Sequence, residues 1–260
     1  MKHLFFKKIL FTFSLGVFIS YSNSFAWGPA GHHIVGQIVK SELPASIRDS
    51  VQKYLGTMSF EDASTWMDDM RSDPSYDYMK TWHYVNIEKG QTYNPKAGER
   101  NVVTELERVI KELNSKSKLS KDQINTDIKV LFHLGEDLGM PLHCGYPEDK
   151  GGNTIKVNFM GKTVNLHHVW DTDIIVYKNI TSDQCINDCS KLSKSELNKL
   201  SKIDVLGWVK DSQSFLPEVY SFQNNTIDDT YINKNVPVIE KQLYISGLRL
   251  AKVLIQIFSK

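Results

Sequence analysis

Apolar residues recur every three or four positions along most of the chain, which is the spacing of helices that bury one face. The clearest case is the segment 121–139, where one apolar stripe is formed by Ile124, Ile128, Leu131 and Leu138. The same spacing predicts further helices over the segments 31–43, 45–55, 60–71, 99–116, 193–216 and 236–258. We therefore expect an all-α, mainly helical fold.

Three segments depart from the helical spacing. Residues 80–90 combine aromatic and β-branched residues before a glycine, and we expect them to be extended. Residues 151–166 alternate around a Met-Gly turn, which predicts a small β-hairpin. Residues 185–189 (CINDC) are typical of a short polar loop. No repeat, low-complexity run or linker interrupts the chain, so we expect a single domain.

The first 26 residues have the pattern of a secretory signal peptide. Lysines precede an apolar run at residues 9–19, and Ser24-Phe25-Ala26 is a small-x-small cleavage site. An uncleaved membrane anchor is the alternative, but the apolar run is too short to span a bilayer. We therefore expect that 1–26 is removed, that the mature chain is 27–260, and that the protein is secreted or periplasmic with no membrane segment in its mature form.

Charge limits the kind of partner. Cleavage would remove three lysines and no acidic residue, which takes the formal charge from +1 to −2. Such a chain lacks the broad basic surface that binds duplex nucleic acid tightly. A polyanionic substrate would therefore have to be attracted locally, for example by bound cations.

The mature chain has three cysteines, and an exported protein permits disulfides. Cys185 and Cys189 lie in one short segment, and we expect them to pair with each other. A metal hook is the alternative, but no second cysteine pair is present to complete a four-thiolate zinc site. Cys144 is then left over, and we expect it to be a small packing residue rather than a reactive thiol.

Histidines and aspartates recur in a pattern that favours a polynuclear metal site. His133 and Asp137 are four positions apart on a predicted helix, so both side chains leave the same face. His167 and Asp171 repeat that spacing, and further candidates are Asp68, His83 and His143. One such pair alone is usually a surface ion pair. Their joint occurrence favours zinc, which imidazole and carboxylate groups bind well.

A mature chain that starts at Trp27 would add a free α-amino group close to His32. The amino nitrogen and the first carbonyl oxygen can chelate a metal in a five-membered ring, so we expect Trp27 and His32 to be ligands. Metal binding would then require signal cleavage. We expect His33 and His168 to have supporting or structural roles instead.

The stretches WGPAGH, WMDDMR, WHYVN, HLGEDLGMPLH and GGN…NLHHVWD occur in this order. Their series resembles that of the zinc-dependent single-strand-specific nucleases of the fungal S1 and P1 type, over essentially the whole mature chain. Zinc-dependent phospholipase C enzymes share this fold and the tryptophan terminus more distantly. The resemblance implies a mainly helical domain of the phospholipase C/nuclease type at 27–260.

The resemblance also implies three Zn²⁺ ions in a cleft. One would be held by Asp68, His83, His133 and Asp137. A second would be held by the Trp27 amino nitrogen and carbonyl, His32 and Asp137, whose carboxylate would bridge the pair. The third would be held by His143, His167 and Asp171.

Three further residues fall at positions that contact the substrate in that family. Arg71 would lie near the scissile phosphate, and Tyr84 would stack on a base. Asn86 stands where the family commonly has an aspartate that contacts the base or the attacking water. Asparagine can donate and accept hydrogen bonds but cannot take up a proton. We expect Asp137, Arg71 and Asn86 to serve catalysis, with the base preference, rate and pH profile affected by Asn86.

The resemblance implies a secreted, zinc-dependent endonuclease. It would hydrolyse phosphodiester bonds of single-stranded DNA and RNA to products with 5′-phosphates, and its partners would be these polymers and nucleotides. Activity as a 3′-nucleotidase stays open, and a monomer is the default. The alternatives are a zinc-dependent phospholipase C, which fits Asp171 and the Asn-Leu-His-x2-Trp-Asp stretch less well, and a zinc-storing protein, which would not need an open cleft.

Overall fold

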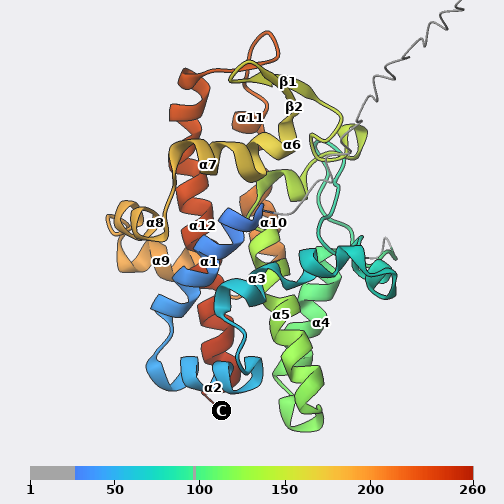
Figure 1. Ribbon diagram of the computed structural model, residues 1–260, viewed down its shortest axis with the longest axis vertical. Helices are drawn as coiled ribbons and strands as arrows, with labels where there is room; N and C mark the ends of the chain where they lie inside the picture. Colours follow the sequence, from blue (N-terminus) through green and yellow to red (C-terminus); the bar gives the residue numbers. More distant parts are fainter. Residues whose placement is uncertain (1–26, 96–97, 260) are drawn as a thin grey trace, which may run out of the picture.

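The computed structural model of the 260-residue chain describes residues 27–95 and 98–259. It is mainly helical, as predicted, with one small sheet at one end (Figure 1). The predicted signal peptide at 1–26 lies outside the described residues. The α-helices are α1 (Pro29–Glu42), α2 (Ala45–Leu55), α3 (Phe60–Asp69), α4 (Val102–Leu113), α5 (Lys121–Asp137), α6 (Leu166–His168), α7 (Ile174–Lys178), α8 (Ser182–Cys189), α9 (Lys194–Leu200), α10 (Val205–Ser214), α11 (Leu216–Val219) and α12 (Asp229–Phe258).

Short helical turns join these helices at the places where the chain changes direction. They are 3₁₀ turns at η1 (Met70–Ser72), η2 (Pro74–Met79), η3 (Lys116–Lys118), η4 (Pro141–Cys144) and η5 (Pro147–Asp149), and a π-helical turn at η6 (Val169–Asp173). Two of them, η4 and η6, carry predicted metal ligands.

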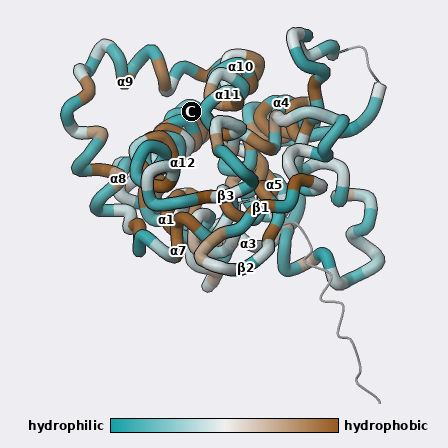
Figure 2. Tube along the Cα trace, turned by 90° about the horizontal axis from the view of Figure 1, so that it is seen from above, coloured by the Kyte–Doolittle hydropathy of each residue, from teal (hydrophilic) through white to brown (hydrophobic). Residues whose placement is uncertain are grey.

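One hydrophobic core runs through the molecule, with the 30-residue helix α12 along its length (Figure 1). Helix α12 packs on α1, α5 and α8, while α3 packs on both α1 and α5. Apolar side chains of these helices form this core, and Figure 2 shows hydrophobic residues interspersed with hydrophilic ones along the trace. Because α1, α3 and α5 contact one another, polar side chains on their facing sides are brought together inside the protein.

Helices α3 and α5, which carry predicted ligands, both begin at capping boxes. The Ser59 hydroxyl accepts the Asp62 N–H and the Asp62 carboxylate accepts the Ser59 N–H, which starts α3. Ser120 and Gln123 form the same reciprocal pair at the start of α5. Such capping boxes satisfy amide groups that have no partner within the helix. They fix where each helix starts, and therefore which faces carry Asp68 and Asp137.

The predicted hairpin is present. Strands β1 (Lys156–Phe159) and β2 (Lys162–Asn165) pair antiparallel, with Phe159 opposite Lys162 across the Met160-Gly161 turn. Both turn residues have positive φ, 50° and 81°, as a two-residue hairpin turn with φ > 0 at both positions requires. A third strand that was not predicted, β3 (Thr226–Ile227), runs parallel to β1, so the order in the sheet is β2-β1-β3.

The extended prediction for residues 80–90 holds for part of the segment. After turns at its start, the chain runs beside the η4 region, where the Val85 and Ile87 amides donate to the carbonyls of His143 and Gly145 (2.8 and 2.9 Å). No β-strand is formed there among the described residues. The contact nevertheless places Tyr84 and Asn86 next to η4.

Three predictions of local structure were wrong. Residues 193–216 form two helices, α9 and α10, because the Asp204 carboxylate accepts the Gly207 amide and starts a new helix. Helix α12 begins at Asp229, ahead of the predicted start, and keeps Pro237 within it. Residues 185–189 are not a loop but the end of α8, which starts at a capping box of Thr181 with Gln184.

The predicted disulfide is not formed in this structure. Cys185 and Cys189 are one helical turn apart on α8, and both are free thiols buried in the core. Cys144 is also free and completely buried, in agreement with a packing role. Within the described part of the chain, no helix is both long and apolar enough to cross a membrane.

Candidate metal centre and substrate cleft

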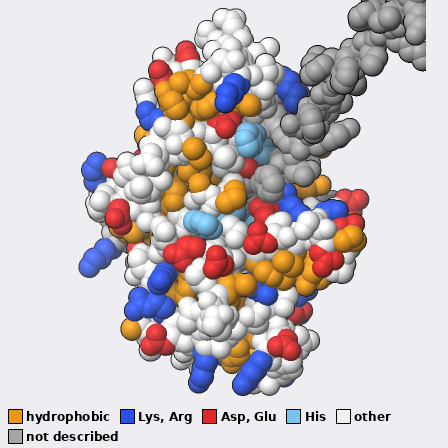
Figure 3. All heavy atoms as spheres, in the orientation of Figure 1, with side chains coloured by type: hydrophobic (Ala, Val, Ile, Leu, Met, Phe, Trp, Pro, Cys, Tyr) orange, Lys and Arg blue, Asp and Glu red, His pale blue; other side chains and the backbone are white. Residues whose placement is uncertain are grey.

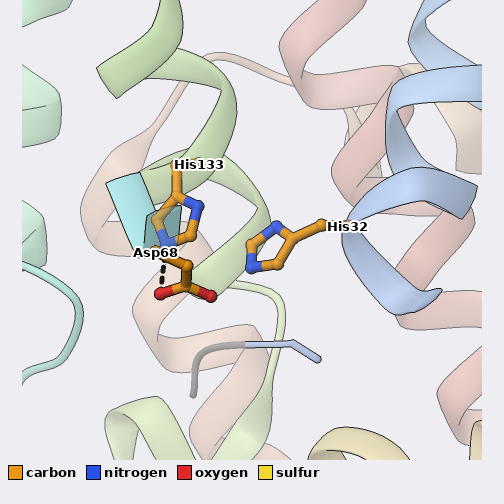
Figure 4. Close-up of side chains that lie close together, drawn as sticks. All are labelled: His32, Asp68 and His133. Atoms are coloured by element: carbon orange, nitrogen blue, oxygen red, sulfur yellow. Dashed lines mark ion pairs between the residues drawn. The ribbon is translucent and has the colours of Figure 1, made fainter. Parts of the chain in front are cut away.

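Helices α1, α3 and α5 bring three predicted ligands together. Figure 4 shows His32 and His133 approaching each other from α1 and α5, with Asp68 of α3 beside them. One ligand atom from each residue lies within 4.8 Å of the others, and His133 Nε2 is 3.6 Å from Asp68 Oδ1. The two imidazole rings are stacked, with centroids 4.2 Å apart.

Asp137, at the end of α5, lies at the centre of the predicted ligands. Its Oδ2 is 3.1 Å from His83 Nδ1 and 3.4 Å from His133 Nε2. Its Oδ1 is 3.6 Å from His32 Nε2 and 3.8 Å from His143 Nδ1. His83, His133 and Asp137 form a second cluster whose ligand atoms all lie within 4.8 Å. The carboxylate thus faces four imidazoles that come from four separate segments.

Three of the candidate histidines, His133, His143 and His167, are oriented by a hydrogen bond between Nδ1 and a backbone carbonyl. His133 Nδ1 lies 2.6 Å from the Ser64 carbonyl, His143 Nδ1 2.7 Å from the His83 carbonyl, and His167 Nδ1 2.7 Å from the Gly151 carbonyl. A carbonyl only accepts, so each Nδ1 must carry the proton and donate. Each Nε2 then keeps its lone pair, which is how a metal-binding histidine is held.

The third predicted ligand set is assembled less tightly. The rings of His143 and His167 stack with centroids 5.0 Å apart. Asp171 follows His167 on the π-helical turn η6 and is completely buried, but it does not join either of the two compact clusters. Gly151 and Gly152 let the chain pass close to Leu142. Both have positive φ, and a Cβ at Gly151 would lie 2.3 Å from the Leu142 carbonyl oxygen.

Burial sets the protonation of the site. It lowers the pKa of His32, His83 and His143 well below the ordinary value, and neighbouring histidines lower it further. Burial also raises the pKa of Asp137 and of Asp171 well above the usual range, and the charge of Asp68 adds to this. A bound cation would be coordinated by the uncharged imidazoles and would stabilise the ionised form of the buried carboxyl groups.

Buried polar atoms without hydrogen-bond partners are a second reason to expect a metal at these residues. Several buried atoms of the predicted ligands have no hydrogen-bond partner among the described residues: His32 Nε2, Asp68 Oδ2, Asp137 Oδ1 and both carboxylate oxygens of Asp171. Buried polar atoms in proteins are nearly always paired, so unpaired ones call for an explanation. Metal coordination supplies one for all five atoms.

A cleft of about 1050 Å³ opens above these groups. Arg71, Tyr84 and Asn86 line it together with His83, His143 and His167. The Arg71 Nε is 2.9 Å from Asp68 Oδ1, which holds the guanidinium at the wall, and 41% of the Tyr84 side chain surface is exposed. On the face shown in Figure 3, histidine side chains reach the surface at two places, with acidic side chains around the lower one.

The start of the described chain is tied to the same region. Trp27 is completely buried, and the Gly28 amide donates to the Asp171 carbonyl (3.0 Å). A Cβ at Gly28 would lie 2.2 Å from the Thr172 hydroxyl, so only glycine fits there without a shift. Of the two histidines expected to have supporting roles, His168 is 3.5 Å from Asp173, whereas His33 is exposed on α1.

Sequence reasoning missed two groups at the site. Glu136 is buried and contacts His32, and the only signal for it was its position directly before Asp137. Lys150 and Asn153 line the cleft on either side of Gly151-Gly152, at the start of the segment predicted as a hairpin. Glu136 was not predicted because its partner His32 comes from a distant segment.

Comparison with known proteins agrees with this geometry. A family model described as S1/P1 Nuclease matches residues 27–259. Endonuclease 2 of Arabidopsis thaliana is 26% identical, over 91% of this chain and 92% of its own length. Nuclease S1 of Aspergillus oryzae is 24% identical over 88% and 90%, and nuclease P1 of Penicillium citrinum is 22% identical over 86% and 95%.

Proposed function

This chain belongs to the S1/P1 nuclease family and is a phosphodiester hydrolase of the endonuclease type, and from that premise we propose its substrate, cofactor and location. We propose a secreted or periplasmic enzyme that depends on zinc and cuts single-stranded DNA and RNA, leaving 5′-phosphates. The observation that carries the proposal is the Asp137 carboxylate, which faces four imidazoles at 3.1–3.8 Å.

The donor set fits three Zn²⁺ ions. Asp68, His83, His133 and Asp137 would hold one of them, and Asp137 would be shared with a second held by His32 and Trp27. His143, His167 and Asp171 would hold the third. Imidazole nitrogen and carboxylate oxygen are usual zinc donors. When bound, the ions would act as Lewis acids and lower the pKa of a coordinated water.

The protein groups around that centre have separate tasks. Arg71 is a fixed cation at the cleft wall, and it would bind a phosphate oxygen and stabilise the charge that grows on it during hydrolysis. The Nδ1–H bonds to backbone carbonyls hold His133, His143 and His167 in one orientation, so no reorganisation is needed when the reaction occurs. Asn86 would hydrogen-bond a base or a water, but it cannot take up a proton.

Preference for single strands follows from Tyr84. Its half-exposed ring lies at the edge of the cleft and would stack on a base. A base in a duplex would first have to leave its own stack, at a cost of about a few kcal/mol. The 2′-hydroxyl is the group that separates RNA from DNA, and none of the roles proposed for Arg71, Tyr84 and Asn86 depends on it. We therefore expect both polymers to be cut.

The decisive experiment compares two forms of the protein, one starting at Trp27 and one carrying a single extra residue before it. Zinc content and cleavage of single-stranded DNA are measured on both. We expect the extended form to lose one zinc and nearly all cleavage. Equal zinc and equal cleavage in the two forms would remove Trp27 from the ligand set. Hydrolysis of phosphatidylcholine in place of DNA would point to the phospholipase alternative.

A further inference from the structure

The imidazole of His32 lies between the carboxylates of two consecutive residues of α5. His32 Nδ1 is 2.5 Å from Glu136 Oε2, and His32 Nε2 is 3.6 Å from Asp137 Oδ1. All three side chains are completely buried. Asp137 is absorbed by the metal-binding proposal, but Glu136 is not among the predicted ligands and contacts only the far side of the ring.

Glu136 is also held from a third helix. The hydroxyl of Ser64 on α3 donates to Glu136 Oε1 (2.7 Å). Space for this contact depends on α1, because a Cβ at Gly36 would lie 2.8 Å from the Ser64 hydroxyl oxygen. The carboxylate therefore bridges α1 and α3 from its place on α5, and its two oxygens are each fixed by a different partner.

His32 differs in this respect from other histidines of the site. His133, His143 and His167 donate their Nδ1–H to backbone carbonyls, which are neutral. His32 instead faces a carboxylate. A side-chain carboxyl oxygen that accepts from Nδ1–H fixes the orientation of the ring and increases the basicity of the other ring nitrogen.

Burying Glu136 in this way lowers the stability of the fold. A buried carboxyl group costs stability even when it is hydrogen-bonded, and within the described residues the ion-pair partner of Glu136 is a histidine rather than an arginine or lysine. A residue that reduces stability in this way is expected at a functional site. Because Glu136 lies behind the candidate ligand His32, we expect its function to be exerted on that ligand.

We infer that Glu136 is a positioning residue for the metal bound through His32. It holds the proton on His32 Nδ1, directs the Nε2 lone pair toward Asp137, and strengthens His32 as a donor. The presence of the metal in this inference rests on the proposed function. The orientation of His32 by Glu136 does not depend on it. Glu136 does not touch the cleft, so its effect on catalysis passes through His32.

Two substitutions separate the hydrogen bond from the charge. Glu136→Gln keeps an oxygen that can accept from His32 Nδ1 but removes the negative charge, whereas Glu136→Leu removes both. Asp127→Asn is the matched control, because Asp127 is another buried carboxylate on α5 that lies outside the site. The readouts are zinc per chain, zinc release to a competing chelator, and ¹⁵N NMR of the His32 ring nitrogens in zinc-free and zinc-loaded protein.

We expect Glu136→Gln to keep the Nδ1–H form of His32 and to weaken one zinc by about tenfold, within the 10–100-fold range of such outer partners. Glu136→Leu should give a mixture of ring forms and lose that zinc, and Asp127→Asn should match wild type. Wild-type ring nitrogen signals and zinc affinity in both Glu136 variants would overturn the inference. If Glu136→Leu does not fold, the zinc affinity of Glu136→Gln alone tests the inference, and a wild-type affinity would overturn it.

The same experiment distinguishes the two proposals. If wild type binds zinc and shows the Nδ1–H form but cleaves no single-stranded DNA, the proposed function fails and the role of Glu136 stands. If wild type cleaves DNA and the Glu136 variants keep both zinc affinity and ring form, the proposed function stands and Glu136 has only a structural role.

Discussion

The imidazole rings of His32 and His133 lie face to face, with their centroids 4.2 Å apart and their planes inclined by 16°. One ring comes from α1 and the other from α5, so the stack joins two helices at the point where their ligands meet. His133 also lies edge-on to His83, 4.7 Å away. Burial lowers the pKa of all three imidazoles, so their uncharged form is favoured in this packing. A change at one of them is therefore expected to affect the others.

Asp137→Asn should abolish activity. The amide cannot offer a second anionic oxygen, so both metals that share Asp137 should be weakened. We expect the rate of single-stranded DNA cleavage to fall by at least about 100-fold, as for the loss of a main electrostatic group. Zinc content should fall by up to two ions per chain. Cleavage at the wild-type rate with full zinc content would contradict the central place of Asp137.

Tyr84→Ala should weaken binding of single strands. Stacking of a base on an aromatic side chain contributes about 1–3 kcal/mol, so KM should rise by roughly 5- to 150-fold. Tyr84→Phe keeps the ring and serves as the control, with a KM close to that of wild type. The measurement is steady-state cleavage of a short single-stranded oligonucleotide. A similar loss in both variants would mean that the hydroxyl, and not the ring, makes the contact.

Asn86→Asp should add a group that can accept a proton in the cleft. General-base assistance contributes about 10²–10⁴-fold, so an increase of at least about tenfold in kcat is expected if the new carboxylate reaches the attacking water. A new acidic limb should appear in the pH–rate profile, because the carboxylate acts only when ionised. Asn86→Ser is the control and cannot add such a limb. An unchanged profile in Asn86→Asp would place residue 86 away from the reacting groups.

Asp127→Asn should stabilise the protein at neutral pH. Burial raises the pKa of Asp127 from 3.8 to about 6, with a further contribution from the charge of Glu112. Because the folded-state pKa is the higher one, the carboxyl is best tolerated below pH 3.8, and stability is lost as the pH rises through 6. The amide avoids this loss, which is about 1–3 kcal/mol for a shift of this size.

Urea denaturation at a series of pH values measures this effect. The gain of Asp127→Asn over wild type should be largest above pH 6 and should shrink as the pH approaches 4. Asp49→Asn, at an exposed position on α2, should give no such trend. A gain of Asp127→Asn that does not depend on pH would assign the effect to packing rather than to ionisation.

A thiol reagent should detect all three cysteines as free thiols once the protein is denatured. Burial raises the pKa of Cys144 to about 12 and that of Cys189 to about 11, and it raises the pKa of Cys185 as well. Buried thiols of this kind react slowly. A thiol reagent should therefore find almost none in the native protein and three after denaturation. One thiol after denaturation would instead show that Cys185 and Cys189 are paired.

The candidate metal-binding residues could be selected from the sequence because their spacing is local. A helix places positions four apart on one face, which singled out the pairs at 133/137 and 167/171. The structure has the first pair on α5, whereas the second runs from α6 into the π-helical turn η6. The helix boundaries were harder, since they depend on caps. The capping box of Thr181 with Gln184 starts α8, whose residues are so polar that they suggested a loop. The Asp204 cap starts α10 and so divides one apolar pattern into two helices.

Glu136 could not have been predicted in this way. A glutamate in a helix is usually exposed, and the reason for burying this one is His32, which is 104 positions away in the chain. The same holds for Ser64, whose hydroxyl reaches Glu136 across 72 positions. Such groups are recognisable only when the contact between α1, α3 and α5 is known.

The buried start of the described chain has a practical consequence for producing the enzyme. Trp27 is enclosed, and in the proposed metal set its amino nitrogen is a ligand, so an affinity tag or linker joined directly before Trp27 would turn that amine into an amide and remove the ligand. At the other end, Ser259 is exposed after α12, whose last part lies at the lower end of the molecule in Figure 1, near α2. Purification handles, immobilisation surfaces and fusion partners therefore belong at the carboxyl end, after this exposed residue.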